Sequence, residues 1–170
     1  MITFIKYALM FLLILFLQRF VLDQVPQIIP YSKLDLFFVF LIMLPGLPTV
    51  WLMLIGFAGG LVFDIFYGTP GINAAACILI AYIKDPLLNL FKDDKENVEY
   101  SAHIAYLGFA KFFFFILTLS VIFHLVAEFL SVFSFEDAGQ TLLRILINAI
   151  LSVILIYIYE IIFFYRRIAA

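Results

Sequence analysis

Charged residues are scarce in this 170-residue chain: only 13% of its residues are Asp, Glu, Lys or Arg, and 66% are hydrophobic. Soluble domains contain about 25% charged and about 45–50% apolar residues, so the composition argues against a soluble protein and predicts a polytopic membrane protein. Six spans of about 20 residues would use about 120 positions and leave too few for a soluble domain. We therefore expect one all-α integral membrane domain over residues 1–170. The net charge of −2 gives no indication of a nucleic-acid partner.

Cysteine and histidine are nearly absent, which excludes several kinds of site. Cys77 is the only cysteine, so an intramolecular disulfide and a multi-cysteine metal site are both excluded. We expect Cys77 to be a small packing residue. The only histidines, His103 and His124, lie at opposite ends of one predicted helix, so we expect no metal centre.

Common enzyme motifs are also missing. The sequence contains no His-Glu-x-x-His zinc helix, no Gly-x-Ser-x-Gly turn and no phosphate-binding glycine loop. These absences favour a protein that is not an enzyme and needs no cofactor. Intramembrane catalysis by a single aspartate, or by His124 together with Glu128, stays an alternative that no motif supports.

Six apolar segments are present, and we expect each to be a membrane span. The second segment is the shortest, because the stretch from Leu34 to Leu44 would extend only about 16 Å as a helix. It either begins near Ile28 or is partly re-entrant. The run after Lys6 is too long for the apolar region of a signal peptide and has no cleavage site after it, so we expect it to be the first span. The predicted spans are residues 4–22, 28–44, 50–67, 72–90, 104–131 and 141–165.

The distribution of basic residues predicts the orientation. With six spans, both termini share one side of the membrane with the loops after the second and fourth spans. On the opposite side, Lys33 is the only basic residue outside the spans. Short cytoplasmic loops are rich in Lys and Arg, so we expect both termini in the cytoplasm. The charged stretch 92–99 is then a solvated cytoplasmic turn, or alternatively a docking site. The basic residues assigned to the cytoplasmic side are Lys6, Lys84, Lys92, Lys95, Arg166 and Arg167.

Ionisable residues within the spans gather toward the outer leaflet in this topology. An isolated charge in the bilayer costs several kcal/mol, so we expect pairs, namely Glu128 with Arg144 and Arg19 with Asp64. His124 and Glu128 are four residues apart and share a helix face, a spacing that suits a proton relay or half of a metal site. These residues either connect the helices structurally or extend to the outer interface. Alternatively, they form a functional polar cavity or partner site that opens outward. The set is Arg19, Asp64, His124, Glu128 and Arg144.

The last span carries polar residues at four-residue steps: Gln140, Arg144, Asn148 and Ser152. Such a stripe is expected to face the bundle interior or a partner helix, where hydrogen bonds can form. Glu160 lies well around the helix from this stripe, so we expect it to reach water. Lys111 and the tyrosines near the C-terminus suit the cytoplasmic interface.

Small residues mark a tight helical hairpin in the middle of the chain. Gly56 and Gly60 form a Gly-x-x-x-Gly pair, which lets two helix backbones approach closely. Gly68, Pro70 and Gly71 then form a hinge into an alanine-rich helix. The third and fourth spans are therefore expected to be antiparallel neighbours.

The hairpin also carries a family resemblance. Gly60-Leu61-Val62-Phe63-Asp64, followed by Gly68, Pro70 and Gly71, is similar to the Gly-Leu-x-x-Asp and Gly/Pro hinge of the MreD family of rod-shape-determining proteins. The chain departs from the commoner Pro-Leu-Gly form, because Pro70 is followed directly by Gly71. The resemblance extends to the size of the chain and its six expected spans.

The resemblance implies a non-enzymatic subunit of the bacterial cell-elongation machinery in the cytoplasmic (inner) membrane. Its implied partner is MreC, a bitopic protein, within a complex that includes MreB, the RodA glycosyltransferase and a class B penicillin-binding protein, with a homodimer as a further option. The family is also similar to the six-helix S-components of energy-coupling-factor transporters. A binding subunit for a vitamin or other small molecule is thus the alternative. The first span lacks the Ala-x-x-x-Ala pattern that S-components often offer their partner, which disfavours it.

Overall fold

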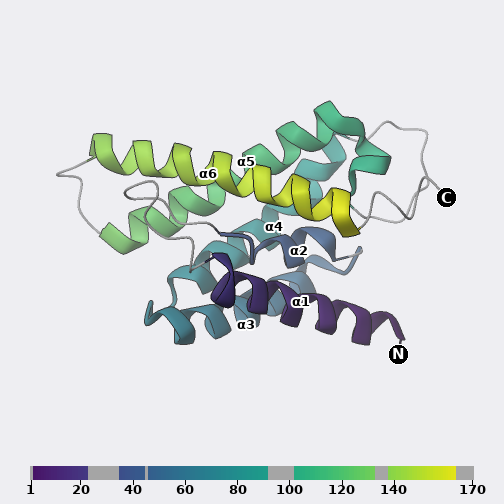
Figure 1. The fold of residues 1–170 in the computed structure, drawn as a ribbon, viewed down its shortest axis with the longest axis horizontal. Coiled ribbons are helices and arrows are strands. Elements are labelled where there is room, and N and C mark those ends of the chain that lie inside the picture. The colour runs from purple at the N-terminus through teal and green to yellow at the C-terminus, as the bar shows by residue number, and fades with distance from the viewer. Residues whose placement is uncertain (1, 23–34, 45, 92–101, 133–137, 164–170) are drawn as a thin grey trace.

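A computed structural model describes residues 2–22, 35–44, 46–91, 102–132 and 138–163, which form helices joined by turns and loops, with no strand among these residues (Figure 1). Four helices, α3 to α6, are long and apolar enough to cross a membrane. The prediction of an α-helical membrane protein is thus confirmed at this level, whereas six complete spans are not shown. The helices are α1 (Ile2–Phe20), α2 (Val39–Met43), α3 (Thr49–Tyr67), α4 (Ile72–Phe91), α5 (Ile104–Val132) and α6 (Ala138–Phe163).

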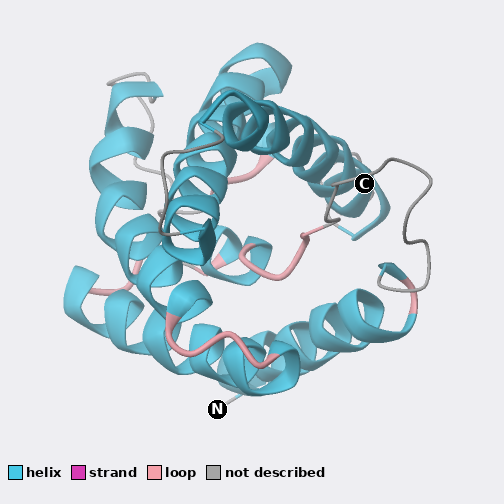
Figure 2. Ribbon diagram, turned by 90° about the vertical axis from the view of Figure 1, so that its left-hand side faces the viewer, coloured by secondary structure: helices cyan, strands magenta, loops and turns pink. Residues whose placement is uncertain are grey.

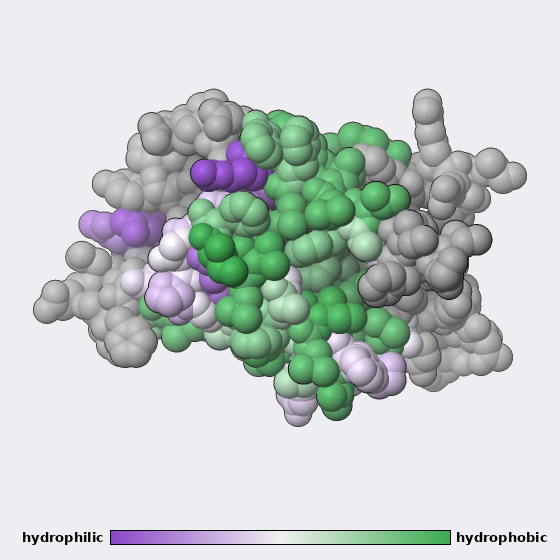
Figure 3. Space-filling view, turned by 90° about the horizontal axis from the view of Figure 1, so that it is seen from below, coloured by the Kyte–Doolittle hydropathy of each residue, from purple (hydrophilic) through white to green (hydrophobic). Residues whose placement is uncertain are grey.

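The outer surface of the long helices is apolar. Large hydrophobic side chains point outward along every long helix, and Ile65 and Leu90 are each 80% exposed. Figure 3 shows a hydrophobic band across the middle of one face, with hydrophilic residues toward one end. Soluble monomers rarely expose apolar patches of this extent, so lipid is the solvent that this surface fits.

Neighbours in sequence are neighbours in space for the four long helices. Helix α3 packs on α4, α4 on α5, and α5 on α6, while α2 contacts α1, α3 and α4. The end-on view in Figure 2 shows long helices around a central stretch of loop and short helix. The N-terminal end of α1 and the C-terminal end of α6 lie on the same side of the molecule (Figure 1).

The predicted second span differs most from expectation. Within residues 28–44, the described part begins at Asp35 and is α-helical only over Val39–Met43, a length of about 8 Å. All residues from Leu36 to Leu44 are buried, and the ring of Phe37 stacks on Phe63 at 3.8 Å. The segment is apolar because protein surrounds it, and composition alone does not distinguish that environment from lipid.

The α3–α4 hairpin depends on glycine at its seam. A Cβ added to Gly60 would lie 2.5 Å from the Cα of Ala74, and one added to Gly56 would lie 3.0 Å from the carbonyl oxygen of Cys77. The two backbones are therefore closer than any side chain at Gly60 permits. Gly68 ends α3 in the left-handed region with φ 65°, a conformation that favours glycine.

Helix α5 is broken near its N-terminal end. Gly108 has φ 73° and ψ 164°, a conformation that interrupts the helix and is essentially restricted to glycine. The carbonyl oxygen of Phe109, the next residue, accepts a hydrogen bond of 2.8 Å from the hydroxyl of Tyr157 on α6. The break is thus tied to the neighbouring helix.

Candidate functional site

Asp64 connects the end of α3 to the start of α4. Its Oδ1 accepts hydrogen bonds from Thr69 Oγ1 at 2.7 Å and from the backbone N and Nδ2 of Asn73, each at 3.0 Å. Its Oδ2 accepts the backbone N–H of Ala74 at 3.0 Å. The first N–H groups of a helix have no partner within it and carry its positive dipole end. The carboxylate is therefore the cap of α4.

Arg19 does not pair with Asp64 as expected. The hydrogen bonds that the structure gives Asp64 all come from the hairpin itself, and Asp64 is only 5% exposed. The exposed Arg19 guanidinium lies instead 5.8 Å from the ring centroid of Tyr67, a cation–π distance. The helix N-terminus supplies the positive partner that we had assigned to Arg19.

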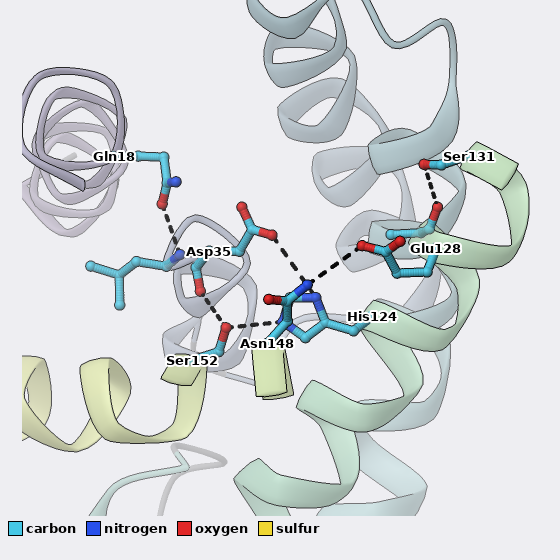
Figure 4. Close-up of polar contacts among 9 residues, drawn as sticks. Gln18, Asp35, His124, Glu128, Ser131, Asn148 and Ser152 are labelled. Atoms are coloured by element: carbon cyan, nitrogen blue, oxygen red, sulfur yellow. Dashed lines mark hydrogen bonds and ion pairs between the residues drawn. The ribbon is translucent and has the colours of Figure 1, made fainter. Parts of the chain in front are cut away.

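A second polar site is buried between α5, α6 and the segment that precedes α2 (Figure 4). The Nε2 of His124 lies 3.0 Å from Ser152 Oγ, and its Nδ1 lies 3.9 Å from Asp35 Oδ2. Ser152 Oγ also lies 2.8 Å from the backbone oxygen of Asp35. His124 and Ser152 are 1% and 0% exposed, so the contacts form within the protein.

The same site has two flanking contacts. The Nδ2 of Asn148 donates to Glu128 Oε1 at 3.4 Å, and the backbone N–H of Leu36 donates to Gln18 Oε1 on α1 at 2.8 Å. Glu128 is therefore bonded to Asn148, one turn along α6 from Arg144, and not to Arg144 as expected. Of the predicted stripe on α6, Asn148 and Ser152 face the interior, Arg144 is half-buried and Gln140 is exposed.

Ser152, His124 and Asp35 follow the order of a Ser-His-Asp catalytic triad, but their hydrogen bonds do not suit nucleophilic catalysis. The oxygen of a backbone carbonyl only accepts, so the Ser152 hydroxyl donates its one proton to Asp35 and not to His124. Ser152 is also fully buried within α6, where backbone N–H groups are bonded along the helix. They are not free to form an oxyanion hole.

The opposite end of the bundle holds a buried acid that we expected in water. Glu160 is 1% exposed; its Oε1 lies 3.0 Å from His103 Nδ1 and accepts the N–H of Ile104 at 3.2 Å. Ile104 is the first residue of α5, so Glu160 caps this helix from α6. The helical periodicity of α6 places Glu160 on a different face from Arg144. That periodicity does not reveal that α5 begins against the face that carries Glu160.

Lys84 is likewise buried and not in a cytoplasmic loop. Its side chain has no exposed surface, and Nζ donates to the carbonyl oxygens of Leu41 at 3.1 Å and Leu44 at 2.6 Å. These carbonyls end the short helix α2, where the dipole is negative. Lys84 therefore contributes nothing to the positive-inside argument.

Sequence reasoning missed Asp35, Gln18 and Lys84 as parts of buried sites. Asp35 sits directly before a run of nine buried residues, 36–44, and an acid at such a boundary is the signal that was available. Lys84 was counted as a loop residue although it lies inside the predicted span 72–90. Among the described residues, no group of three or more His, Cys, Asp or Glu side chains is placed to hold a metal ion.

Comparison with known proteins adds no further constraint. The chain matches no protein-family model, no curated protein and no solved structure. The functional argument therefore depends on the residues and geometry described above.

Proposed function

We propose that this chain is a non-enzymatic membrane subunit of the bacterial cell-elongation machinery, similar to MreD, and that it binds an MreC-like bitopic protein in the cytoplasmic membrane. Its proposed role is to hold that partner beside MreB, RodA and a class B penicillin-binding protein during peptidoglycan synthesis. Both termini are proposed to face the cytoplasm. The resemblance over residues 60–71 is the origin of this proposal.

The observation that carries the proposal is that the residues of the resemblance form one physical unit. Gly60 allows α3 and α4 to touch, Asp64 caps α4, and Gly68 ends α3 with a positive φ. Each residue type is therefore required by the geometry of this turn. Such a motif is more specific than a chance run of small and apolar residues, which supports the resemblance.

The buried polar site also favours a scaffold over an enzyme. His124, Asn148 and Ser152 are at most 1% exposed and bonded to other residues of this chain. These side chains fill the interior between α5 and α6. An interior that is filled and hydrogen-bonded within the chain is compatible with a subunit that presents its apolar outer surface to a partner helix.

The transporter alternative has one observation in its favour, the short internal helix α2. Transporters often bind substrates and ions at the ends of such broken helices. In this chain, however, the C-terminal end of α2 is occupied by the Lys84 ammonium. The alternative therefore requires a binding site at another place.

Co-purification tests the proposal. The tagged chain is extracted from its native membranes in mild detergent, and the proteins that accompany it are identified by mass spectrometry. We expect an MreC-like protein with one span and a periplasmic domain, in near-equal amount. Recovery of an ATPase-linked transmembrane subunit, or of a tightly held small molecule without any MreC-like protein, would contradict the proposal and support the transporter.

A further inference from the structure

We infer that the C-terminal third of α4 is the docking surface for the transmembrane helix of a bitopic partner, and that Asp85 pairs there with a Lys or Arg of that helix. The docking surface consists of Tyr82, Asp85, Pro86 and Asn89. The inference rests on the proposed function, from which it takes the single-span partner and the orientation of the chain. It adds the place of contact and the chemistry that recognises the partner.

Asp85 lies within an apolar membrane helix without a counter-charge. It is six residues from the end of α4 at Phe91, a distance of about 9 Å. Its Oδ1 is buried and accepts no hydrogen bond from any described residue. Ionisable residues inside membrane spans are rare and pair with other charges or with backbone groups. Asp64 and Glu160 follow this rule, whereas Asp85 does not.

The residue that follows Asp85 creates a second acceptor. Pro86 lies inside α4 and has no N–H, so it does not donate to the carbonyl oxygen of Tyr82, four residues earlier. That carbonyl points along the helix toward Pro86, which is adjacent to Asp85. A backbone group without a partner is unfavourable in hydrocarbon, as an unpaired side chain is. Two acceptors without a helical donor therefore lie within one turn of α4.

This part of α4 is accessible from outside the molecule. Tyr82 is 58% exposed, Pro86 and Asn89 are exposed, and Asp85 is half-buried. Tyr82, Asp85 and Asn89 follow at steps of three and four residues, which places them on one face of the helix. The neighbouring cation, Lys84, is instead directed into the core, toward the carbonyl oxygens at the end of α2. A partner therefore reaches Asp85 without unfolding the helix.

The start of α3 adds an aromatic side chain beside this surface. Gly60 lies against Ala74 in the antiparallel hairpin, so nine residues back along α3 and nine residues forward along α4 bring Trp51 level with Ile83. Trp51 is the only tryptophan of the chain and is 60% exposed. Tryptophan and tyrosine are enriched among the residues that dominate binding energy. Trp51 and Tyr82 thus provide apolar contact area next to the unpaired carboxylate.

The chemistry of the docking surface selects a cation with several N–H donors. A Lys side chain has three donors and an Arg side chain has five, enough for the Asp85 carboxylate and the Tyr82 carbonyl together. In the proposed orientation, the C-terminal end of α4 faces the cytoplasm. A bitopic protein whose domain lies outside carries its Lys and Arg excess on the short cytoplasmic flank of its span. The partner's positive charge and Asp85 therefore meet at the same depth.

The pairing predicts opposite effects of one substitution on stability and on binding. In the purified full-length chain, Asp85→Asn removes a buried charge that has no partner, so the midpoint of unfolding should stay the same or rise. In the complex, the same substitution removes half of an ion pair, and the affinity for the partner should fall by about tenfold. Asp85→Glu keeps the charge and should keep most of the affinity.

Cross-linking in native membranes tests the contact. A photoreactive phenylalanine analogue replaces Tyr82, and the same analogue at Ile154, which is 50% exposed on α6, is the control. We expect the analogue at position 82, and not the one at 154, to cross-link to the single-span protein that co-purifies with the wild-type chain, next to its cytoplasmic Lys or Arg. Asp85→Lys should abolish co-purification, and replacing that basic residue of the partner with Asp should restore it.

The outcomes separate failure of this inference from failure of the proposed function. If the wild-type chain recovers no single-span protein, the proposed function fails and the docking surface with it. If it recovers that protein, and Asp85→Asn recovers it equally or Tyr82 cross-links to lipid alone, only the docking inference is overturned. A lower midpoint of unfolding for Asp85→Asn in the purified chain would also overturn it, because Asp85 would then be an internal structural contact.

Discussion

Replacing Asp64 separates its role in the hairpin from any role of its charge alone. In Asp64→Ala, the N–H of Ala74, the N–H and amide of Asn73 and the hydroxyl of Thr69 all lose their acceptor. In Asp64→Asn, the carbonyl oxygen keeps the place of Oδ1, which accepts three of these bonds. Only the bond to Ala74 and the negative charge are then lost.

The structure gives a magnitude for each variant. Loss of a helix cap costs about 0.5–2 kcal/mol, and a buried donor without a partner costs about 1–3 kcal/mol. Thr69 and Asn73 are half-buried and regain water, so the cap and Ala74 dominate. We expect the free energy of unfolding to fall by about 2–4 kcal/mol in Asp64→Ala and by about 1–2 kcal/mol in Asp64→Asn.

The assay is reversible unfolding in mixed micelles, followed by circular dichroism, with Ile65→Ala as the matched control. Ile65 is adjacent in sequence but 80% exposed on the apolar surface, and its truncation should change stability by less than about 0.5 kcal/mol. A loss below about 0.5 kcal/mol in Asp64→Ala would refute the capping role. Equal losses in both Asp64 variants would show that the negative charge and the bond to Ala74, which both variants lose, provide the stabilisation and that the three bonds to Oδ1 contribute little.

Three further substitutions test the structure in the same unfolding assay. Gly60→Ala should lower the free energy of unfolding by about 1–3 kcal/mol because its Cβ meets the α4 backbone. The control is Gly139→Ala, where a Cβ meets nothing within 4 Å and the effect should be neutral or stabilising. Equal effects of the two substitutions would contradict the close approach of α3 and α4. Gly108→Ala should cost about 1–3 kcal/mol through backbone strain alone, and a neutral result would mean that α5 is unbroken. Lys84→Met should cost about 2–4 kcal/mol because two buried carbonyls lose their donor, and unchanged stability would remove Lys84 as the tie to α2.

The α3–α4 hairpin could be predicted from sequence because local residues determine it. The predicted segments 50–67 and 72–90 correspond to helices Thr49–Tyr67 and Ile72–Phe91. Gly68, Pro70 and Gly71 interrupt the apolar run where only glycine and proline suit the backbone. No information from distant parts of the chain is needed to place this turn.

The second segment and the charge pairs could not be predicted, because they depend on tertiary contacts. Apolar residues at 36–44 are compatible with lipid or with a protein interior, and only the surrounding helices decide between them. Glu160 lies 57 residues from His103, so periodicity within one helix contains no information about their contact. We assumed that opposite charges pair with each other, whereas Asp64 is bonded at the N-terminal end of α4 and Glu128 to the side chain of Asn148.

Helix ends account for three of the buried charges, and this separates them from His124. Asp64 and Glu160 are at the N-terminal ends of α4 and α5, and Lys84 is at the C-terminal end of α2. In each case the sign of the charge matches the dipole of that end, so the helix end stabilises the buried side chain that caps it. The contacts of His124 are instead with a hydroxyl and a carboxylate, so this side chain ties α5 to α6 and to the segment before α2 without capping a helix.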